Sequence, residues 1–152
     1  MYPCLWFNGN AKEAAIFYCS IFSNSKILSE NPMVVNFELN GMKFMGLNGG
    51  PMYQFSPANS YVIECNNQEE IDHYWYKLGQ DGVYGQCGWL EDKFGVSWQI
   101  IPTILGKLMS NPKKAKPIKR CLLIIFPLQL IWLYPFVWFG VFLTSFISPF
   151  IV

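Results

Sequence analysis

The sequence predicts an α+β fold made of two similar halves, each consisting of a strand, a helix and then antiparallel strands. Three observations lead to this prediction. Residues 4–18 are echoed by residues 61–75, and in both copies a short apolar run ends in Asn. Apolar residues then recur at helical spacing, and after each helical stretch they alternate with a period of two.

Two Asn-x-x-Glu motifs predict where the helices begin. Asn10 and Asn67 can accept a hydrogen bond from a free amide of the first turn, while Glu13 and Glu70 reach back as in a capping box. We expect helices over residues 11–22 and 68–78, and a short one over 103–109. The residues at helical spacing are Ala14, Phe17, Tyr18 and Ile21 in the first helix and Ile71, Tyr74, Trp75 and Leu78 in the second.

Two turns organise the strands. Asn40-Gly41 is a strong hairpin signal, and Asp92-Lys93-Phe94-Gly95 predicts a second tight turn. The expected strands are residues 4–7, 26–29, 33–39, 43–47, 60–65, 84–90 and 96–101. Along the last strand the bulky Val96, Trp98 and Ile100 share one face, so Gln99 should point away from the helix.

The composition argues against some classes of function and favours one cellular setting. Residues 1–112 contain all ten acidic residues and are net acidic, so they offer no basic stripe for nucleic acid. The five cysteines are widely spaced and form no CxxC pair, which favours a reducing, cytoplasmic setting. We expect no signal peptide, because the first 13 residues reach Asn and Glu before any long apolar run.

Three segments carry a resemblance to a known family: "CLWFNGNAKEAAIFYCSIF", "FELNGMKFMGLNGGP" and "GQCGWLEDKFGVSWQIIP". Residues 1–112 resemble the PhnB-like branch of the vicinal oxygen chelate superfamily, which has the glyoxalase and bleomycin-resistance fold and is often labelled demethylubiquinone methyltransferase-like. The resemblance implies two βαβββ modules, about residues 1–52 and 57–112. They would form a cupped antiparallel sheet with helices on its outer face, often in a homodimer.

The resemblance also implies where a metal would bind in metal-dependent relatives. Their ligands correspond to positions near Pro3, Ser60, Met45 and Gln99 of this sequence. Only Gln99 has an oxygen suited to a metal, and divalent cations prefer several carboxylate or imidazole ligands. We therefore expect no metal and no other cofactor.

The same alternation of faces, applied to the other strands, predicts the lining of the cup. The expected ligand-binding residues are Leu5, Phe7, Lys43, Met45, Val62, Glu64, Ser97 and Gln99. Glu64 is the candidate catalytic base if it is buried, because desolvation raises the pKa of a carboxylate. The alternative is that Lys43 and Glu64 form a solvated ion pair at the rim of the cup.

Other motifs have simpler interpretations. His73 should lie on a helix surface, and "LNGGP" (residues 47–51) should be a turn that joins the halves rather than a phosphate loop. Cys87 could be a reactive thiol, but a buried and inert strand cysteine is the simpler interpretation. No glycine-rich motif for adenosylmethionine follows a predicted strand.

The composition changes at residue 113. Basic residues cluster between Lys113 and Arg120, and residues 121–152 carry no charge. By composition alone, residues 113–152 are interpreted as a membrane span, with a positively charged flank that keeps the domain on the cytoplasmic side. The resemblance implies another interpretation, because relatives continue with a charged, soluble helix. In that case these residues come from a frameshifted or misread 3' end of the coding sequence.

Three functions follow as hypotheses. The first is a metal-free module that binds a small organic ligand as a cytoplasmic homodimer. The second is an enzyme of the superfamily. It would be a lyase or isomerase using Glu64, one using a metal through ligands other than those named above, or a methyltransferase as the family label has it. The third is a membrane-tethered sensor or interaction domain, which depends on the tail alone.

Overall fold

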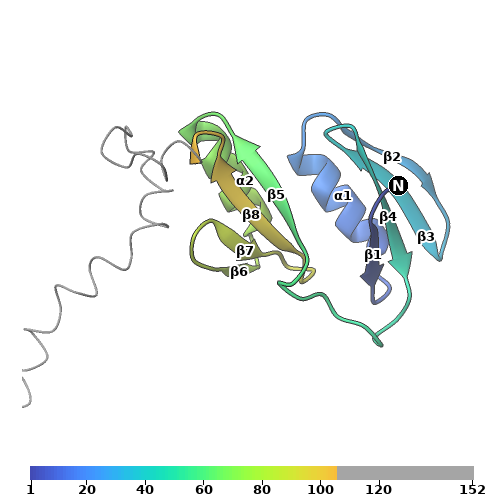
Figure 1. The fold of residues 1–152 in the computed structure, drawn as a ribbon. Helices are drawn as coiled ribbons and strands as arrows, with labels where there is room; N and C mark the ends of the chain where they lie inside the picture. Colours follow the sequence, from blue (N-terminus) through green and yellow to red (C-terminus); the bar gives the residue numbers. More distant parts are fainter. Residues whose placement is uncertain (106–152) are drawn as a thin grey trace, which may run out of the picture.

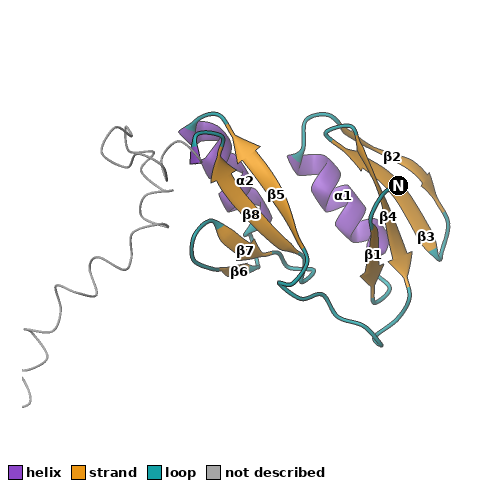
Figure 2. Cartoon of the chain, viewed as in Figure 1, coloured by secondary structure: helices purple, strands orange, loops and turns teal. Residues whose placement is uncertain are grey.

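The computed structural model describes residues 1–105, which form two βαβββ modules joined by a linker over residues 49–59 (Figures 1 and 2). The first module contains β1 (Cys4–Phe7), α1 (Ala11–Ile21), β2 (Ser25–Glu30), β3 (Val34–Leu39) and β4 (Met42–Asn48). The second contains β5 (Ser60–Cys65), α2 (Gln68–Leu78), β6 (Val83–Tyr84), β7 (Trp89–Glu91) and β8 (Ser97–Pro102). The predicted repeat of strand, helix and strands is therefore confirmed.

Each module has its own four-stranded mixed sheet, in the orders β1-β4-β3-β2 and β5-β8-β7-β6. The β1–β4 and β5–β8 pairs are parallel, and the remaining pairs are antiparallel. The prediction of one antiparallel cup is wrong on both counts. The last strand of each module returns beside the first after the helix has crossed the sheet, and such a crossover makes the pair parallel.

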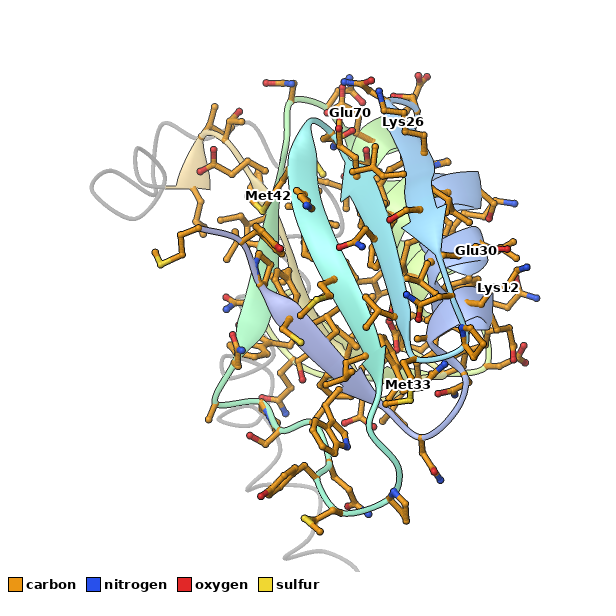
Figure 3. The ribbon with its side chains drawn as sticks, turned by 90° about the vertical axis from the view of Figure 1, so that its right-hand side faces the viewer. Lys12, Lys26, Glu30, Met33, Met42 and Glu70 are labelled. Atoms are coloured by element: carbon orange, nitrogen blue, oxygen red, sulfur yellow. The ribbon has the colours of Figure 1, made fainter. Side chains whose placement is uncertain are left out.

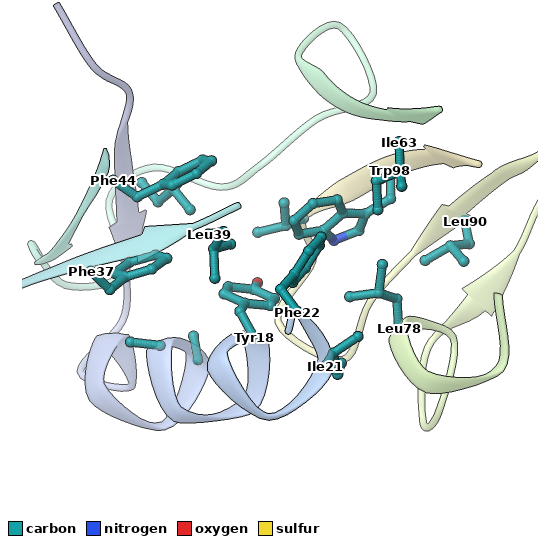
Figure 4. Packing of buried hydrophobic residues seen from close by; sticks show 14 of the residues in the cluster. Tyr18, Ile21, Phe22, Phe37, Leu39, Phe44, Ile63, Leu78, Leu90 and Trp98 are labelled. Carbon is teal, nitrogen blue, oxygen red and sulfur yellow. The ribbon is translucent and has the colours of Figure 1, made fainter. Parts of the chain in front are cut away.

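Helix α1 lies between the first sheet and the second module (Figure 1). The ring of Tyr18 is 6.2 Å from that of Phe37 in β3 and 5.4 Å from that of Trp98 in β8. Figure 4 shows Tyr18 and Phe22 in the layer that also holds Leu39 and Trp98. The prediction that helices cover an outer face is thus wrong for α1, because its large side chains are apolar enough to be buried against both modules.

The two helices begin differently. In α2 the Asn67 side chain accepts from Glu70 N at 2.9 Å, and Glu70 Oε2 accepts from Asn66 N at 2.8 Å, so the predicted cap is confirmed. In α1 the Asn10 side chain makes no capping bond. Instead, Asn48 Oδ1 at the end of β4 accepts from Ala11 N at 2.9 Å, so a residue distant in sequence satisfies this amide.

Turn chemistry explains the strand boundaries. Asn40 and Gly41 have φ of 49° and 81°, as expected of a two-residue hairpin, and Gly95 N donates to Asp92 O at 2.9 Å across the other predicted turn. The strand predicted over residues 84–90 is instead two short strands. Cys87 and Gly88, with φ of 55° and 81°, interrupt it.

One exposed ion pair ties α1 to the edge of the first sheet. Lys12 Nζ lies 2.7 Å from Glu30 Oε1, and both side chains are half exposed (Figure 3). Such a pair contributes at most about 1 kcal/mol.

The C-terminal segment is not covered by these observations. The helix predicted over residues 103–109 lies partly outside the described residues, and the basic and apolar tail over 113–152 lies wholly outside them. Within residues 1–105, neither helix has the length and apolar character needed to cross a bilayer.

Candidate functional site

A cavity of about 320 Å³, which we call the β5 cavity, opens between the β3–β4 hairpin and strand β5. Its walls carry the rings of Phe22, Phe44, Tyr61 and Trp98, and its polar members are Asn40, Ser60 and Glu64. The Phe44 and Tyr61 rings lie 5.4 Å apart, and the Tyr61 and Trp98 rings lie 5.4 Å apart. Both modules therefore contribute to one aromatic wall.

Two of the predicted ligand-binding residues, Val62 and Glu64, line this cavity. Both side chains are exposed, and they alternate along β5 with Ile63 and Cys65, which are buried. Strand β5 is at the edge of its sheet, so residues of both faces reach the cavity. Glu64 is thus placed to contact a ligand, while its exposure removes the desolvation on which its role as a base depended.

Gln99 and Ser97 lie on the face of β8 that was predicted. Val96, Trp98 and Ile100 are buried in the core, whereas Gln99 points the other way and donates from Nε2 to Ser60 Oγ at 2.8 Å. Ser97 is buried and pairs in register with Ser60. Through Ser60, Gln99 is linked to the β5 cavity, although it does not line it.

The placement of Leu5 and Phe7 with Lys43 and Met45 is wrong. In the parallel β1–β4 pair, Cys4 is opposite Met45 and Leu5 is opposite Gly46, so Leu5 and Met45 lie on different faces. Leu5 and Phe7 are buried in the core. Alternation along one strand does not reveal the register between two strands, and a shift of one residue exchanges the faces.

Lys43 contacts a residue other than its predicted partners. Its Nζ lies 4.4 Å from the centre of the Tyr2 ring. Among residues 1–105 the ion pairs are Lys12–Glu30 and Lys93–Glu13, so the predicted Lys43–Glu64 pair does not form. The structure therefore does not bring Lys43, Glu64 and Gln99 together as one site.

The four positions that correspond to metal ligands in relatives are joined in pairs by hydrogen bonds. Met45 N donates to Pro3 O at 3.1 Å in the first module, just as Gln99 contacts Ser60 in the second. A proline, a thioether, a hydroxyl and an amide do not suit a divalent cation, which prefers carboxylates and imidazoles. Within the described residues, no group of three or more His, Cys, Asp or Glu side chains could hold a metal. A metal-free site stays a prediction.

Asp92, which the sequence indicated only as part of a tight turn, is a buried carboxylate. Its Oδ2 accepts from Tyr18 Oη and Trp98 Nε1, both at 2.8 Å, and its Oδ1 accepts from Phe94 N at 2.8 Å and Val96 N at 3.1 Å. Burial raises the pKa of Asp92, and these four hydrogen bonds oppose the rise. The Asp-x-x-Gly turn indicated that Asp92 would accept hydrogen bonds from nearby backbone amides. Nothing in the sequence indicated that the Tyr18 hydroxyl would also donate to it.

Burial also raises the pKa of Tyr18 well above its usual range, and the neighbouring Asp92 charge adds to that rise. The phenol therefore stays protonated and donates to the carboxylate. Because Tyr18 belongs to α1 and Asp92 to the turn between β7 and β8, this bond connects the two modules. All four hydrogen bonds to the Asp92 carboxylate come from donors of the protein itself. We therefore assign this carboxylate to stability rather than to ligand binding.

His73 and Cys87 are both exposed in the structure. His73 is exposed on α2, as predicted, and one of its ring nitrogens lies 2.9 Å from Ile21 O at the end of α1. Cys87 is exposed in the interruption between β6 and β7, so the prediction of a buried strand cysteine is wrong.

Two mixed βαβββ modules with an aromatic cavity between them define a domain of the vicinal oxygen chelate type. Residues 1–101 match the model of the family described as 3-demethylubiquinone-9 3-methyltransferase, and the chain belongs to this PhnB-like family. The predicted family is thereby confirmed.

Solved structures agree with this membership. A PhnB protein from Bacillus cereus, described as a 3-demethylubiquinone-9 3-methyltransferase, is 35% identical, with a TM-score of 0.63 over 68% of this chain and 98% of its own. A protein from Pseudomonas aeruginosa is 19% identical, with a TM-score of 0.56 over 67% of this chain and 96% of its own.

The fosfomycin resistance protein FosX from Listeria monocytogenes, solved with Mn(II) and sulfate, is 16% identical to this chain. Its TM-score is 0.52 over 72% of this chain and 94% of its own. At this identity FosX shares the fold alone, as does the Pseudomonas protein. No curated protein matches the chain.

Proposed function

We propose that this chain is a metal-free module that binds a small organic ligand in the β5 cavity. The observation that carries the proposal is the aromatic wall built by both modules around a volume of about 320 Å³. Ligand sites in proteins are typically apolar hollows of roughly 300–1,000 Å³ with a few polar groups that orient the ligand. Asn40, Ser60 and Glu64 supply such groups here.

The aromatic and the polar residues of the β5 cavity have different roles in binding. The rings exclude water from an apolar or aromatic ligand, and each buried ring contributes area that stabilises the complex. Glu64 is exposed at the edge strand and can accept a hydrogen bond from a ligand hydroxyl or amine. Ser60 is held by Gln99 and presents its hydroxyl in a fixed position.

The test is a titration of the full chain with catechol and 2-methoxyphenol. These probes are suitable because the family description names a demethylated ubiquinone, whose reduced quinol form is a substituted phenol. We expect saturable shifts of the Trp98 indole resonance in NMR spectra, and binding about threefold to tenfold weaker in Glu64→Gln, since the amide oxygen still accepts but the charge of the acceptor is lost. Glu69→Gln, an exposed acid on α2, is the control.

Two results would contradict the binding module. One is the absence of any saturable shift with either probe. The other is equal weakening by Glu64→Gln and Glu69→Gln, which would mean that a general charge effect and not the β5 cavity determines affinity.

Methyl transfer is the second candidate, and the family description favours it. In that reaction the methyl group of S-adenosylmethionine passes to a phenolate oxygen of the acceptor, the thioether leaves, and the phenol proton goes to solvent or to Glu64. Incubation of the full chain with S-adenosylmethionine and catechol tests this. Formation of 2-methoxyphenol by mass spectrometry, lost in Glu64→Gln, would make the chain an enzyme.

A lyase or isomerase reaction, the other enzyme hypothesis, requires Glu64 to remove a proton from the ligand. An exposed carboxylate lacks the desolvation that would make it a stronger base. No specific observation favours this chemistry over binding.

We also propose that the chain forms a homodimer in the cytoplasm. Exposed apolar side chains on the two modules support this, with Met33, Met42 and Val62 each more than half exposed. Sedimentation analysis of the full chain measures the mass, and a monomer would contradict the dimer.

The membrane-tethered alternative depends on residues outside the described part of the chain. Membrane attachment that survives a carbonate wash would support it, whereas release of the full chain by the wash would contradict it.

A further inference from the structure

A second hollow, which we call the linker groove, lies where linker residues 53–55 cross the end of β1 and the β7–β8 turn. Its volume is about 260 Å³. It shares no residue with the β5 cavity, so it is a separate feature of the molecule. Its walls are the aromatic rings of Trp6, Phe7, Tyr53, Phe55 and Phe94.

The Trp6 ring is held in place by the Gly49-Gly50 turn. Its indole Nε1 donates to Gly50 O at 2.8 Å. A Cβ at Gly49 would clash with the Trp6 ring, so only glycine allows the ring to pack against this backbone. Gly49 N and Gly50 N both donate to Phe7 O, at 3.0 and 3.2 Å, which fixes the turn against β1. This wall of the groove is therefore formed before any ligand arrives.

The rings meet nearly at right angles. Trp6 and Tyr53 have centroids 5.0 Å apart with 79° between their planes, and Phe7 and Phe55 are 5.3 Å apart at 66°. Phe7 and Phe94 are 6.4 Å apart at 88°. Rings arranged as a corner surround a guest with more than one electron-rich face, and such faces attract cations.

The charges around the groove have the sign that a cation requires. Of the described residues that line it, Glu91 alone carries a full charge, and that carboxylate is exposed and makes no ion pair. Lys93 lies nearby, but its Nζ is 3.3 Å from Glu13 Oε1, so its charge is balanced. The same Nζ lies 5.0 Å from the Phe94 ring, which is within the distance at which a ring face attracts a cation.

From this geometry we propose that the linker groove binds a small organic cation, an amine or quaternary ammonium group, in the corner formed by the Trp6 and Tyr53 rings and beside the Glu91 carboxylate. Its volume is below the range of roughly 300–1,000 Å³ usual for drug-sized ligands, so the guest is small. This site is independent of the proposed ligand of the β5 cavity, and either can fail without the other.

The experiment compares two probes of equal shape and different charge, choline and 3,3-dimethylbutan-1-ol. Each is titrated into the full chain, and binding is followed by the indole N–H resonance of Trp6, assigned with the variant Trp6→Phe. We expect choline to bind about tenfold more tightly than its neutral isostere, because only the cation is attracted by the rings and by Glu91.

Two pairs of variants locate the binding. Tyr53→Leu and Glu91→Gln should each weaken choline binding about threefold or more, because one removes a ring and the other the charge. Their controls are Tyr76→Leu and Glu69→Gln on α2, with Tyr53 and Tyr76 of similar exposure at 61% and 54%. The controls should leave the affinity unchanged.

Three results would overturn the proposal. They are the absence of saturable choline binding, equal affinity for the two probes, and choline binding that Glu64→Gln weakens while Glu91→Gln does not. The last result would place the cation in the β5 cavity instead.

Discussion

Replacement of Tyr18 by Phe tests how the two modules are held together. Tyr18 is 0% exposed and its hydroxyl donates to Asp92, which is 3% exposed, at 2.8 Å. Phe keeps the ring contacts with Phe37 and Trp98 and removes only the hydroxyl. The change therefore isolates one buried hydrogen bond between α1 and the β7–β8 turn.

The expected loss follows from the kind of bond. A hydrogen bond to a charged group contributes about 1.5–3 kcal/mol to stability. Three donors to Asp92 remain in the variant, so the carboxylate keeps most of its partners. We expect Tyr18→Phe to lower the free energy of unfolding by about 1.5–3 kcal/mol, which shifts the urea midpoint by roughly 1–2 M at a slope near 1.5 kcal/mol/M.

Asp92→Asn should cost more than Tyr18→Phe. The amide oxygen can take the place of Oδ1, but the amide nitrogen then faces Tyr18 Oη and Trp98 Nε1. The Tyr18 hydroxyl can rotate to accept from it, whereas the indole N–H can only donate. One buried donor is left without a partner, at a cost of about 1–3 kcal/mol beyond the lost charge interaction.

The effect of Tyr18→Phe should also depend on pH. The Tyr18 hydrogen bond favours the ionised carboxylate and so lowers the pKa of Asp92, while burial raises it above the ordinary value of 3.8. Because burial prevails, the contribution of Asp92 to stability falls as pH rises from about 3.8 through the raised pKa. The difference between wild type and Tyr18→Phe should grow as pH rises from the pKa of Asp92 in the wild type to its higher pKa in the variant, because the bond matters most to the charged form.

Urea unfolding of the full chain at pH 7 and at a pH below 4, followed by circular dichroism, measures both effects. Tyr53→Phe, at an exposed tyrosine of the linker, is the control and should change stability by less than about 0.5 kcal/mol. The reasoning is refuted if Tyr18→Phe matches this control, or if its cost is the same at both pH values.

Three further predictions concern local structure. Asn67→Ala should destabilise the protein by about 0.5–2 kcal/mol in urea unfolding, whereas Asn10→Ala should have little effect, since Asn67 caps its helix by a side-chain bond and Asn10 does not. Asn48→Ala should cost about 1–3 kcal/mol in the same assay because it removes bonds to Ala11 N and Pro32 O, and a neutral result would contradict its role as the cap of α1. Gly49→Ala should displace the Trp6 ring, and an unchanged Trp6 indole resonance would show that the contact is not as close as described.

Much of the fold could be predicted from the sequence. The repeat located both helices within a residue, and the Asn40-Gly41 and Asp92–Gly95 turns located the hairpins. Along β8, alternation placed Gln99 correctly, because every second side chain of a strand must share a face. These features depend on residues a few positions apart, which is the range over which sequence patterns are informative.

The candidate site was predicted only in part. Val62 and Glu64 line the β5 cavity, and their role in ligand binding stays a prediction. Leu5 and Phe7 were assigned to the wrong face, and Asp92 was not recognised as a buried carboxylate. The sequence contained no sign of the register between β1 and β4. The linker groove was missed for the same reason, because its rings come from three distant segments of the chain.

The sequence by itself determined the module repeat, the order of its elements and the family to which the chain belongs. The tertiary structure decided which strands pair in parallel, that one face of α1 is buried against both modules, and that Tyr18 meets Asp92 across 74 residues of chain. The physical reason is that capping, turns and alternation are local, whereas register and buried polar partners are selected by the packing of the whole core.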